Sequence, residues 1–188
     1  ETPQSVTLIT NQMISDKGLV TMEAVLNHTP GVTMVGDASE NSQIFVRGYA
    51  LDTGVQVDGL ISTSSSHVYS GSIDQGLDPV IAERVEVLKG AAGILSGLGE
   101  PSATVNFIRK RPTDKNSASA NVSYGSWNSY RLEGDASGQL TDSGEVKGRI
   151  VGAVQQGDSF IDRYHRDTAV LYGVVETSLS LDTSLSLF

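Results

Sequence analysis

Residues 78–111 read Asp-Pro-Val-Ile-Ala-Glu-Arg-Val-Glu-Val-Leu-Lys-Gly-Ala-Ala-Gly-Ile-Leu-Ser-Gly-Leu-Gly-Glu-Pro-Ser-Ala-Thr-Val-Asn-Phe-Ile-Arg-Lys-Arg, and this stretch decides the fold. Residues 84–89 alternate between two faces and are rich in β-branched side chains, which predicts a half-buried strand. Glycines at positions 90, 93, 97 and 99 then indicate tight turns in place of a long helix. Residues 104–109 predict a second short strand.

A strand that ends in a glycine turn also occurs in dinucleotide-binding folds. Here the glycines at 97 and 99 lack the third glycine at the required offset, and Pro101 stands where the phosphate-binding helix would begin. No Gly-Lys-Ser/Thr follows. A cytosolic nucleotide-binding enzyme that uses residues 90–99 is therefore the disfavoured alternative, and mass spectrometry for bound nucleotide would test it.

Toward the N-terminus the pattern predicts a small mixed α/β domain. Helices are expected at 11–17 and 22–27, the second capped by Thr21 and stopped by the Thr-Pro-Gly at 29–31. Short strands are expected at 4–10, 32–35, 43–48 and 54–58. A polar segment, 62–75, follows and has the composition of a surface loop.

After Pro112 the pattern changes to long stretches of strict period two. Strands of about ten residues, the length that crosses a bilayer in a tilted barrel, are predicted at 117–126, 130–140, 145–156 and 168–181, with a fifth beginning near Leu185. Residues 141–144 and 181–183 make short connections and residues 157–167 a longer one. This asymmetry is typical of the periplasmic and extracellular ends of a barrel.

Composition excludes several classes of function. The net charge of -9 gives no basic face for nucleic acid. With no cysteine there can be no disulfide, cysteine-based zinc site or thiol nucleophile. No apolar run is long enough for a transmembrane helix, which leaves barrel strands open. Catalytic motifs are absent and His28, His67 and His165 lie far apart, so we expect neither an enzyme nor a protein-bound metal.

Five blocks of sequence carry a resemblance to a known family. They are residues 3–10, 26–32, 44–49, 57–59 and 78–111, in that order along the chain. Together they closely resemble the plug domain of TonB-dependent outer-membrane receptors for ferric siderophores. The resemblance implies an α+β plug domain at residues 1–112, followed at 113–188 by the first strands of an antiparallel transmembrane β-barrel. Because such a barrel has about 22 strands, it is incomplete in this chain and cannot close.

The family's function is the function that the resemblance implies. The receptor would bind a ferric siderophore at the outer membrane of a Gram-negative bacterium and import it to the periplasm. Energy would come from TonB with ExbB and ExbD, and a TonB box would precede Glu1. Outer-membrane lipid is the other expected partner, and the ferric siderophore is cargo, so no cofactor is expected. A siderophore-sensing signal transducer of the same family is the alternative, which an N-terminal signalling domain would identify.

The resemblance also places candidate ligand contacts on the plug loops. Relative to receptors of the ferric-pyoverdine type, His67, Val68 and Tyr69 match a position that touches the siderophore. Tyr69 is the strongest candidate, because a phenol offers an apolar ring and a hydrogen-bonding tip. Asn41 falls where those receptors carry an arginine, which puts the same contact in doubt. Weaker candidates are Asp37, Glu40 and, in the 157–167 loop, Phe160, Arg163, Tyr164 and His165.

We expect Arg47 and Arg84 to have a structural role. Each lies inside a predicted strand of β-branched residues, where a guanidinium group is costly unless it is paired. An ordinary ion pair with Glu83 or Glu86 is one interpretation. In the receptors that this chain resembles, the matching arginines lock the plug to glutamates on the barrel wall.

Overall fold

The computed structural model describes residues 5–36, 42–51, 55–61, 77–90, 103–158, 163–180 and 183–188. The chain divides into two compact units, Glu1–Arg109 and Lys110–Phe188. The predicted division at residue 112 lies close to this boundary.

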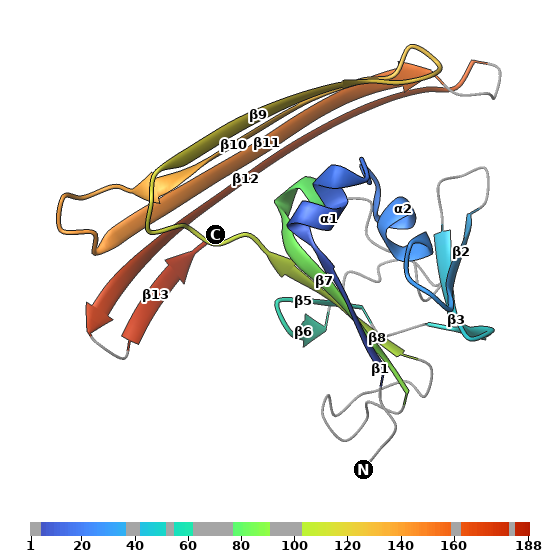
Figure 1. Cartoon of the computed structure of the whole chain (residues 1–188), viewed down its shortest axis with the longest axis horizontal. Helices are drawn as coiled ribbons and strands as arrows, with labels where there is room; N and C mark the ends of the chain where they lie inside the picture. The colour runs from blue at the N-terminus through green and yellow to red at the C-terminus, as the bar shows by residue number, and fades with distance from the viewer. Residues whose placement is uncertain are drawn as a thin grey trace. The chain divides into compact units, whose positions relative to one another are not determined.

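Unit 1 contains the mixed sheet that the sequence predicts. Its strands are β1 (Ser5–Thr10), β5 (Val55–Val57), β6 (Leu60–Ile61), β7 (Ala82–Lys89) and β8 (Ala103–Arg109), in the order β1-β7-β8-β5-β6 (Figure 1). Neighbouring strands are antiparallel except for β5 and β8, which are parallel. Because β7 and β8 pair antiparallel, they do not form the parallel crossover that a dinucleotide-binding fold needs at this point.

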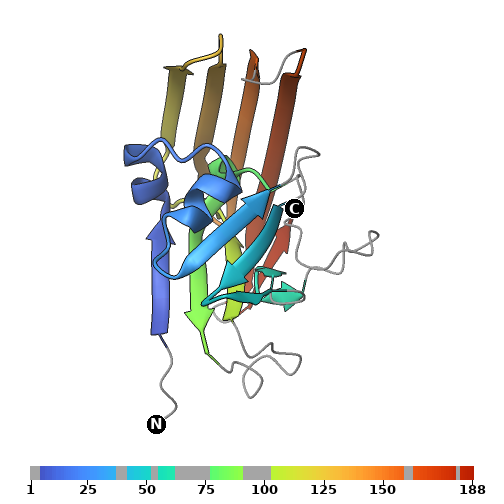
Figure 2. The same ribbon diagram turned by 90° about the vertical axis from the view of Figure 1, so that its right-hand side faces the viewer.

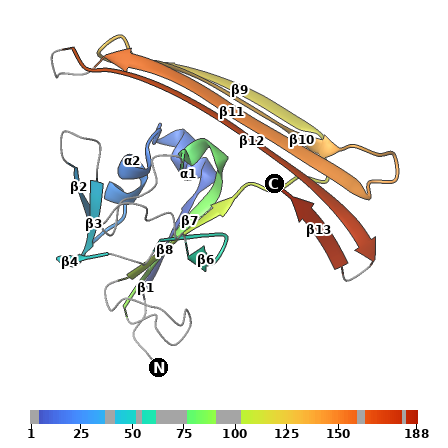
Figure 3. The ribbon, with the colours of Figure 1, turned by 180° about the vertical axis from the view of Figure 1, so that it is seen from behind.

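A second, smaller sheet and two α-helices also belong to unit 1 (Figure 3). The sheet is β2 (Val32–Gly36), β3 (Ser42–Val46) and β4 (Tyr49–Ala50), and the helices are α1 (Asn11–Asp16) and α2 (Met22–Asn27). Both begin at a threonine cap, as predicted for α2: Thr10 Oγ1 accepts from Met13 N (3.3 Å) and Thr21 Oγ1 from Ala24 N (3.1 Å). None of the helices that the structure describes is long and apolar enough to cross a membrane.

The core of unit 1 collects the apolar positions of these elements. The alternation predicted for β7 is confirmed, since Val85 and Val87 are buried while Arg84, Glu86 and Leu88 are only partly buried. Just before β7, residues Pro79–Ile81 form a short 3₁₀ helix, η1, that the sequence pattern did not predict. The largest fully buried apolar side chains of the unit are Ile9, Val25, Leu26, Ile44, Val46, Leu51, Val85, Val87, Val105 and Phe107.

Unit 2 is one antiparallel sheet with strands in sequence order. The strands are β9 (Ser117–Tyr124), β10 (Tyr130–Gln139), β11 (Val146–Asp158), β12 (His165–Ser180) and β13 (Thr183–Leu187). Figure 1 shows the long strands as one curved layer, and Figure 2 shows them side by side. The five strands predicted after Pro112 are therefore confirmed, with β11 and β12 longer than expected at the end where they connect.

Candidate functional site

The predicted siderophore contacts lie outside the described residues. Asp37 and Asn41 belong to the segment between β2 and β3, and His67, Val68 and Tyr69 belong to the segment between β6 and η1. These five assignments stay predictions. Among the weaker candidates, the same holds for Glu40 and Phe160.

Arg47 lies in a turn, and the prediction that it lies inside a strand is wrong. β3 ends at Val46, which pairs with Tyr49 of β4, so Arg47 and Gly48 form a two-residue hairpin loop. Their φ angles are 53° and 85°, and a type I′ turn requires positive φ at both positions. The prediction failed because the β-branched residues before Arg47 continue the period-two pattern up to the turn. The turn leaves the Arg47 side chain exposed.

Arg84 lies in β7 as predicted and makes a local ion pair. Its Nε atom donates to Glu86 Oε1 at 2.7 Å, and Asn106 Nδ2 donates to the other carboxylate oxygen at 3.3 Å. The arginine and glutamate side chains are 41% and 32% exposed. A pair with this much solvent access contributes at most about 1 kcal/mol to stability. Of the two acids expected as local partners, Glu86 therefore fills the role.

The Val57-Asp58-Gly59 block forms a second tight turn, between β5 and β6. Asp58 and Gly59 have φ angles of 51° and 80°. The Asp58 carboxylate accepts from Arg109 Nε at 2.6 Å and from Arg109 N at 2.9 Å, while Gly59 N donates to Asn106 Oδ1 at 2.9 Å. Sequence reasoning used this block for the resemblance but gave Asp58 no role. Its arginine partner is 51 residues away, beyond the reach of a local pattern.

The sheet of unit 2 has one exposed apolar face. Paired residues on antiparallel strands share a face, and Leu132 pairs with both Val122 and Val154. A water-soluble sheet buries its apolar face, whereas exposure on this scale fits a face in contact with lipid. The large exposed apolar side chains on this face are Val122, Tyr124, Tyr130, Leu132, Leu140, Ile150, Val154, Leu171, Val175, Leu179, Leu185 and Leu187.

The opposite face of the same sheet carries the charged residues and is rich in ion pairs, beside a buried apolar patch of Val151, Ala153, Tyr172 and Val174. Arg131 Nε lies 2.5 Å from Glu133 Oε1, and Arg131 Nη1 donates to Gln155 Oε1 at 3.1 Å. The sheet thus has one exposed apolar face and one face that carries its charges, as barrel strands require.

His165 lies at the loop end of β11 and β12, where two carboxylates hold its ring. Asp158 and His165 are strand partners, so the connection between β11 and β12 is residues 159–164. The predicted loop, 157–167, is therefore too long, because residues 157–158 and 165–167 belong to the strands. His165 Nδ1 lies 2.9 Å from Asp158 Oδ1, and Nε2 lies 3.1 Å from Asp167 Oδ1. The prediction failed because these strand residues are polar on both faces.

The acids around His165 also set its protonation. These residues lie beyond Val154 and Ala169, the last apolar side chains that β11 and β12 place on the exposed face at this end of the sheet. The hydrogen bond with Asp158, together with the charge of Asp167, raises the pKa of His165 above its usual 6.5. Among the described residues no group of His, Asp and Glu side chains could hold a metal ion.

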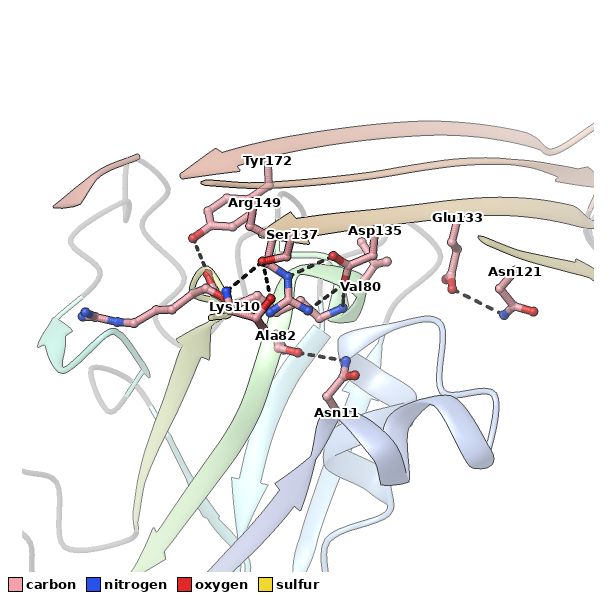
Figure 4. A network of polar contacts seen from close by, with 12 residues as sticks. Asn11, Val80, Ala82, Lys110, Asn121, Glu133, Asp135, Ser137, Arg149 and Tyr172 are labelled. Atoms are coloured by element: carbon pink, nitrogen blue, oxygen red, sulfur yellow. Dashed lines mark hydrogen bonds and ion pairs between the residues drawn. The ribbon is translucent and has the colours of Figure 1, made fainter. Parts of the chain in front are cut away.

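Sequence reasoning missed a further cluster, centred on Asp135 of β10 (Figure 4). The Asp135 carboxylate accepts hydrogen bonds from Lys110 Nζ at 2.8 Å and from Arg149 Nε and Nη2 at 2.9 and 2.8 Å. The sequence placed Asp135 on the polar face of its strand. It carried no sign of the lysine, which lies 25 residues earlier.

Comparison with known families identifies the class of the protein. The model of the TonB-dependent receptor plug domain matches residues 1–104. The chain therefore belongs to the TonB-dependent receptor plug domain family, as the five sequence blocks predicted.

Several similar proteins are receptors for pyoverdine. The chain is 44% identical over 186 residues to the ferripyoverdine receptor of Pseudomonas aeruginosa, covering 99% of this chain and 23% of the receptor. It is 42% identical over 188 residues to the ferric-pyoverdine 358 receptor of Pseudomonas putida, covering 100% of this chain and 23% of that one. The solved outer-membrane receptor of Pseudomonas aeruginosa bound to pyoverdine matches with a TM-score of 0.90 at 43% identity, over 98% of this chain and 27% of that chain.

These matches confirm the predicted fold class, a plug domain followed by antiparallel barrel strands. The chain spans about a quarter of the length of the curated relatives that it matches. The relatives are receptors of ferric siderophores in the outer membrane, the class and the location that the sequence predicted.

Proposed function

We propose that the chain is the plug and the first barrel strands of a receptor that imports a ferric siderophore of the pyoverdine class across the outer membrane of a Gram-negative bacterium. TonB, with ExbB and ExbD, supplies the energy by displacing the plug. The receptor catalyses no reaction and carries no cofactor, because the iron arrives inside its own chelator.

One observation carries this proposal beyond family membership. The sheet that follows the plug exposes its apolar side chains on one face and carries its charges on the other. That arrangement suits strands with lipid on one side and a polar lumen on the other. A plug joined to such strands is the arrangement of a gated receptor for large polar cargo.

The siderophore contacts proposed are Tyr69, with His67 and Val68 beside it, and Asn41 and Asp37. Tyr69 is the centre of the site because its ring stacks on a bulky ferric complex while its hydroxyl group donates a hydrogen bond. The relatives named for ferric pyoverdine support the assignment of this cargo.

Arg47 and Arg84 are proposed to lock the plug to acidic residues of later barrel strands. Arg47 suits this role because it stands exposed on a tight turn. Arg84 already has Glu86 as a partner, so a lock at this position forms a three-membered charge cluster and not a simple pair.

The test measures binding of ferric pyoverdine to the full-length receptor through the quenching of tyrosine and tryptophan fluorescence. We expect the ferric complex to quench and the iron-free siderophore to quench far less. Tyr69→Phe removes only the phenol hydroxyl and is expected to weaken binding about tenfold, equivalent to about 1.4 kcal/mol.

Tyr124→Phe is the matched control, since Tyr124 is 78% exposed on the apolar face of the barrel sheet, the face proposed to contact lipid. It is expected to bind like the wild type. Absence of any response to ferric pyoverdine or other ferric chelates would overturn the proposed function. Equal weakening by both substitutions would remove Tyr69 from the site.

A further inference from the structure

Residues 110–116, here called the linker, join the end of β8 to the start of β9 and form neither helix nor strand. A segment without its own secondary structure must find other partners for its backbone polar groups. Side chains of three strands supply them. Tyr172 Oη donates to Lys110 O at 2.8 Å, and Arg149 Nη1 donates to Arg111 O at 2.9 Å. Thr113 N donates to Ser137 Oγ at 2.8 Å.

Charges fix the register of the linker on the sheet. Two cations of the linker form ion pairs with acids on the strands. Lys110 Nζ lies 2.8 Å from Asp135 Oδ2, and Arg111 Nη1 lies 3.8 Å from Glu176 Oε1. Further along, the signs reverse, because Asp114 of the linker pairs with Lys147 of β11. A shift of the linker along the sheet would place like charges together, so this order of charges favours one position.

The inner part of this contact is shielded from water. The side chains of Lys110, Arg149 and Asp135 are only 6%, 12% and 15% exposed. Arg149 binds the carboxylate with two parallel hydrogen bonds, the strongest geometry for such a pair. Release of Lys110 from this cluster would cost the Asp135 carboxylate and the buried Tyr172 hydroxyl group one hydrogen bond each, which opposes release of the linker.

We propose that the linker is a static anchor, which stays bound to β10, β11 and β12 while the plug moves. The inference rests on the proposed function, which supplies the movement. Plug displacement then begins on the N-terminal side of Lys110, and the pull of TonB does not reach β9. The barrel strands are thereby protected from a force that acts on the plug.

A reversible cross-link tests the anchor in the full-length receptor. Thr113 Oγ1 and Ser137 Oγ are 2.9 Å apart, so sulfur atoms at these positions can bond on oxidation, and residues 1–188 contain no cysteine to compete. The double variant Thr113→Cys, Ser137→Cys is oxidised with copper phenanthroline, and uptake of radioactive iron as ferric pyoverdine is measured before and after reduction. We expect oxidised and reduced receptor to import within about twofold of each other.

Import that falls more than tenfold on oxidation and returns on reduction, with ferric pyoverdine binding unchanged, would overturn the proposal. The control pair is Asn121→Cys, Glu133→Cys, which joins register partners on β9 and β10. Oxidation of this control pair should leave import unchanged. A fall in its import would reveal damage by the oxidant itself. A wild-type receptor that neither binds nor imports the siderophore would refute the proposed function instead.

Hydrogen exchange decides the inference independently of import. The amide of Thr113 donates to the side chain of Ser137 and not to the backbone of a neighbouring strand. We expect its protection to persist in the resting receptor and during TonB-driven turnover, in step with amides of β10. Protection that is already absent at rest, or is lost when TonB acts, contradicts a static anchor whatever the cross-link shows.

Discussion

Thr29 carries a buried hydroxyl group that has no hydrogen-bond partner. The residue is 1% exposed, and its Oγ1 is the one atom of this kind among the described residues. Valine has nearly the same shape without the unsatisfied group, so Thr29→Val should raise the free energy of unfolding by about 1 kcal/mol. Denaturant titration of the full-length receptor measures the change.

Thr33→Val is the control for this substitution, because Thr33 lies on β2 and its side chain is exposed. This substitution should change the free energy of unfolding by no more than about 0.5 kcal/mol in either direction. Destabilisation by Thr29→Val beyond that range would mean that the hydroxyl group has a partner in the whole receptor.

Single residues were predictable where a local pattern decided their environment. Burial of Val85 and Val87 followed from alternation in β7. The turn at Arg47 did not, because only the glycine after it hints at positive φ and the residues before it look like more strand. The contacts of Asp58 and Asp135 were beyond prediction, since their partners come from distant parts of the chain.

At the level of elements, the ends of β11 and β12 should respond to pH. The hydrogen bond with Asp158 raises the pKa of His165, while the same bond lowers the pKa of Asp158 from 3.8. The raised pKa means that charged His165 stabilises this hairpin end fully below pH 6.5, and the contribution is lost as pH rises through the folded pKa. Asp158 contributes above pH 3.8 and its part is lost as pH falls through its lowered pKa.

An NMR titration of His165 in the detergent-solubilised full-length receptor is expected to show a midpoint above 6.5. Asp158→Asn should lower that midpoint. Asp142→Asn should leave it unchanged, because Asp142 lies in the turn between β10 and β11, at the other end of the strands. A wild-type midpoint at or below 6.5 would show that the two carboxylates do not hold the ring.

Long strands and capped helices were predicted well, and very short elements were not. β4 and β6 have two residues each, too few to show any period. The ends of β11 and β12 were missed for a different reason. Where strands pass beyond the apolar band, both faces carry polar residues, and the alternation that marks a strand disappears.

For the whole molecule, the exposed apolar face should tolerate charge only near its margins. Ile150 is 55% exposed and pairs with Ala136 and Gly173 in the middle of the sheet. Ile150→Arg is expected to destabilise the receptor in lipid vesicles by about 2–4 kcal/mol, the cost of an arginine at the bilayer midplane. Guanidinium titration of the vesicle-embedded receptor measures the loss.

Leu140→Arg is the matched control, since Leu140 is 62% exposed but follows the last residue of β10. Near the interface the same arginine should cost only about 0–1 kcal/mol. Equal losses at both positions would contradict a lipid-facing sheet.

The sheet of unit 2 ends at β9, whose outer side has no neighbouring strand among the described residues. In a finished cylinder with an even number of strands, the receptor's last strand returns to this seam and runs antiparallel to β9. Residues that come to rest opposite Ala118, Ala120 and Val122 share their lipid-facing side and must be apolar. Residues of the first barrel strand therefore constrain the composition of the last one. In a barrel of 22 strands the two are separated by a sequence distance on the order of hundreds of residues.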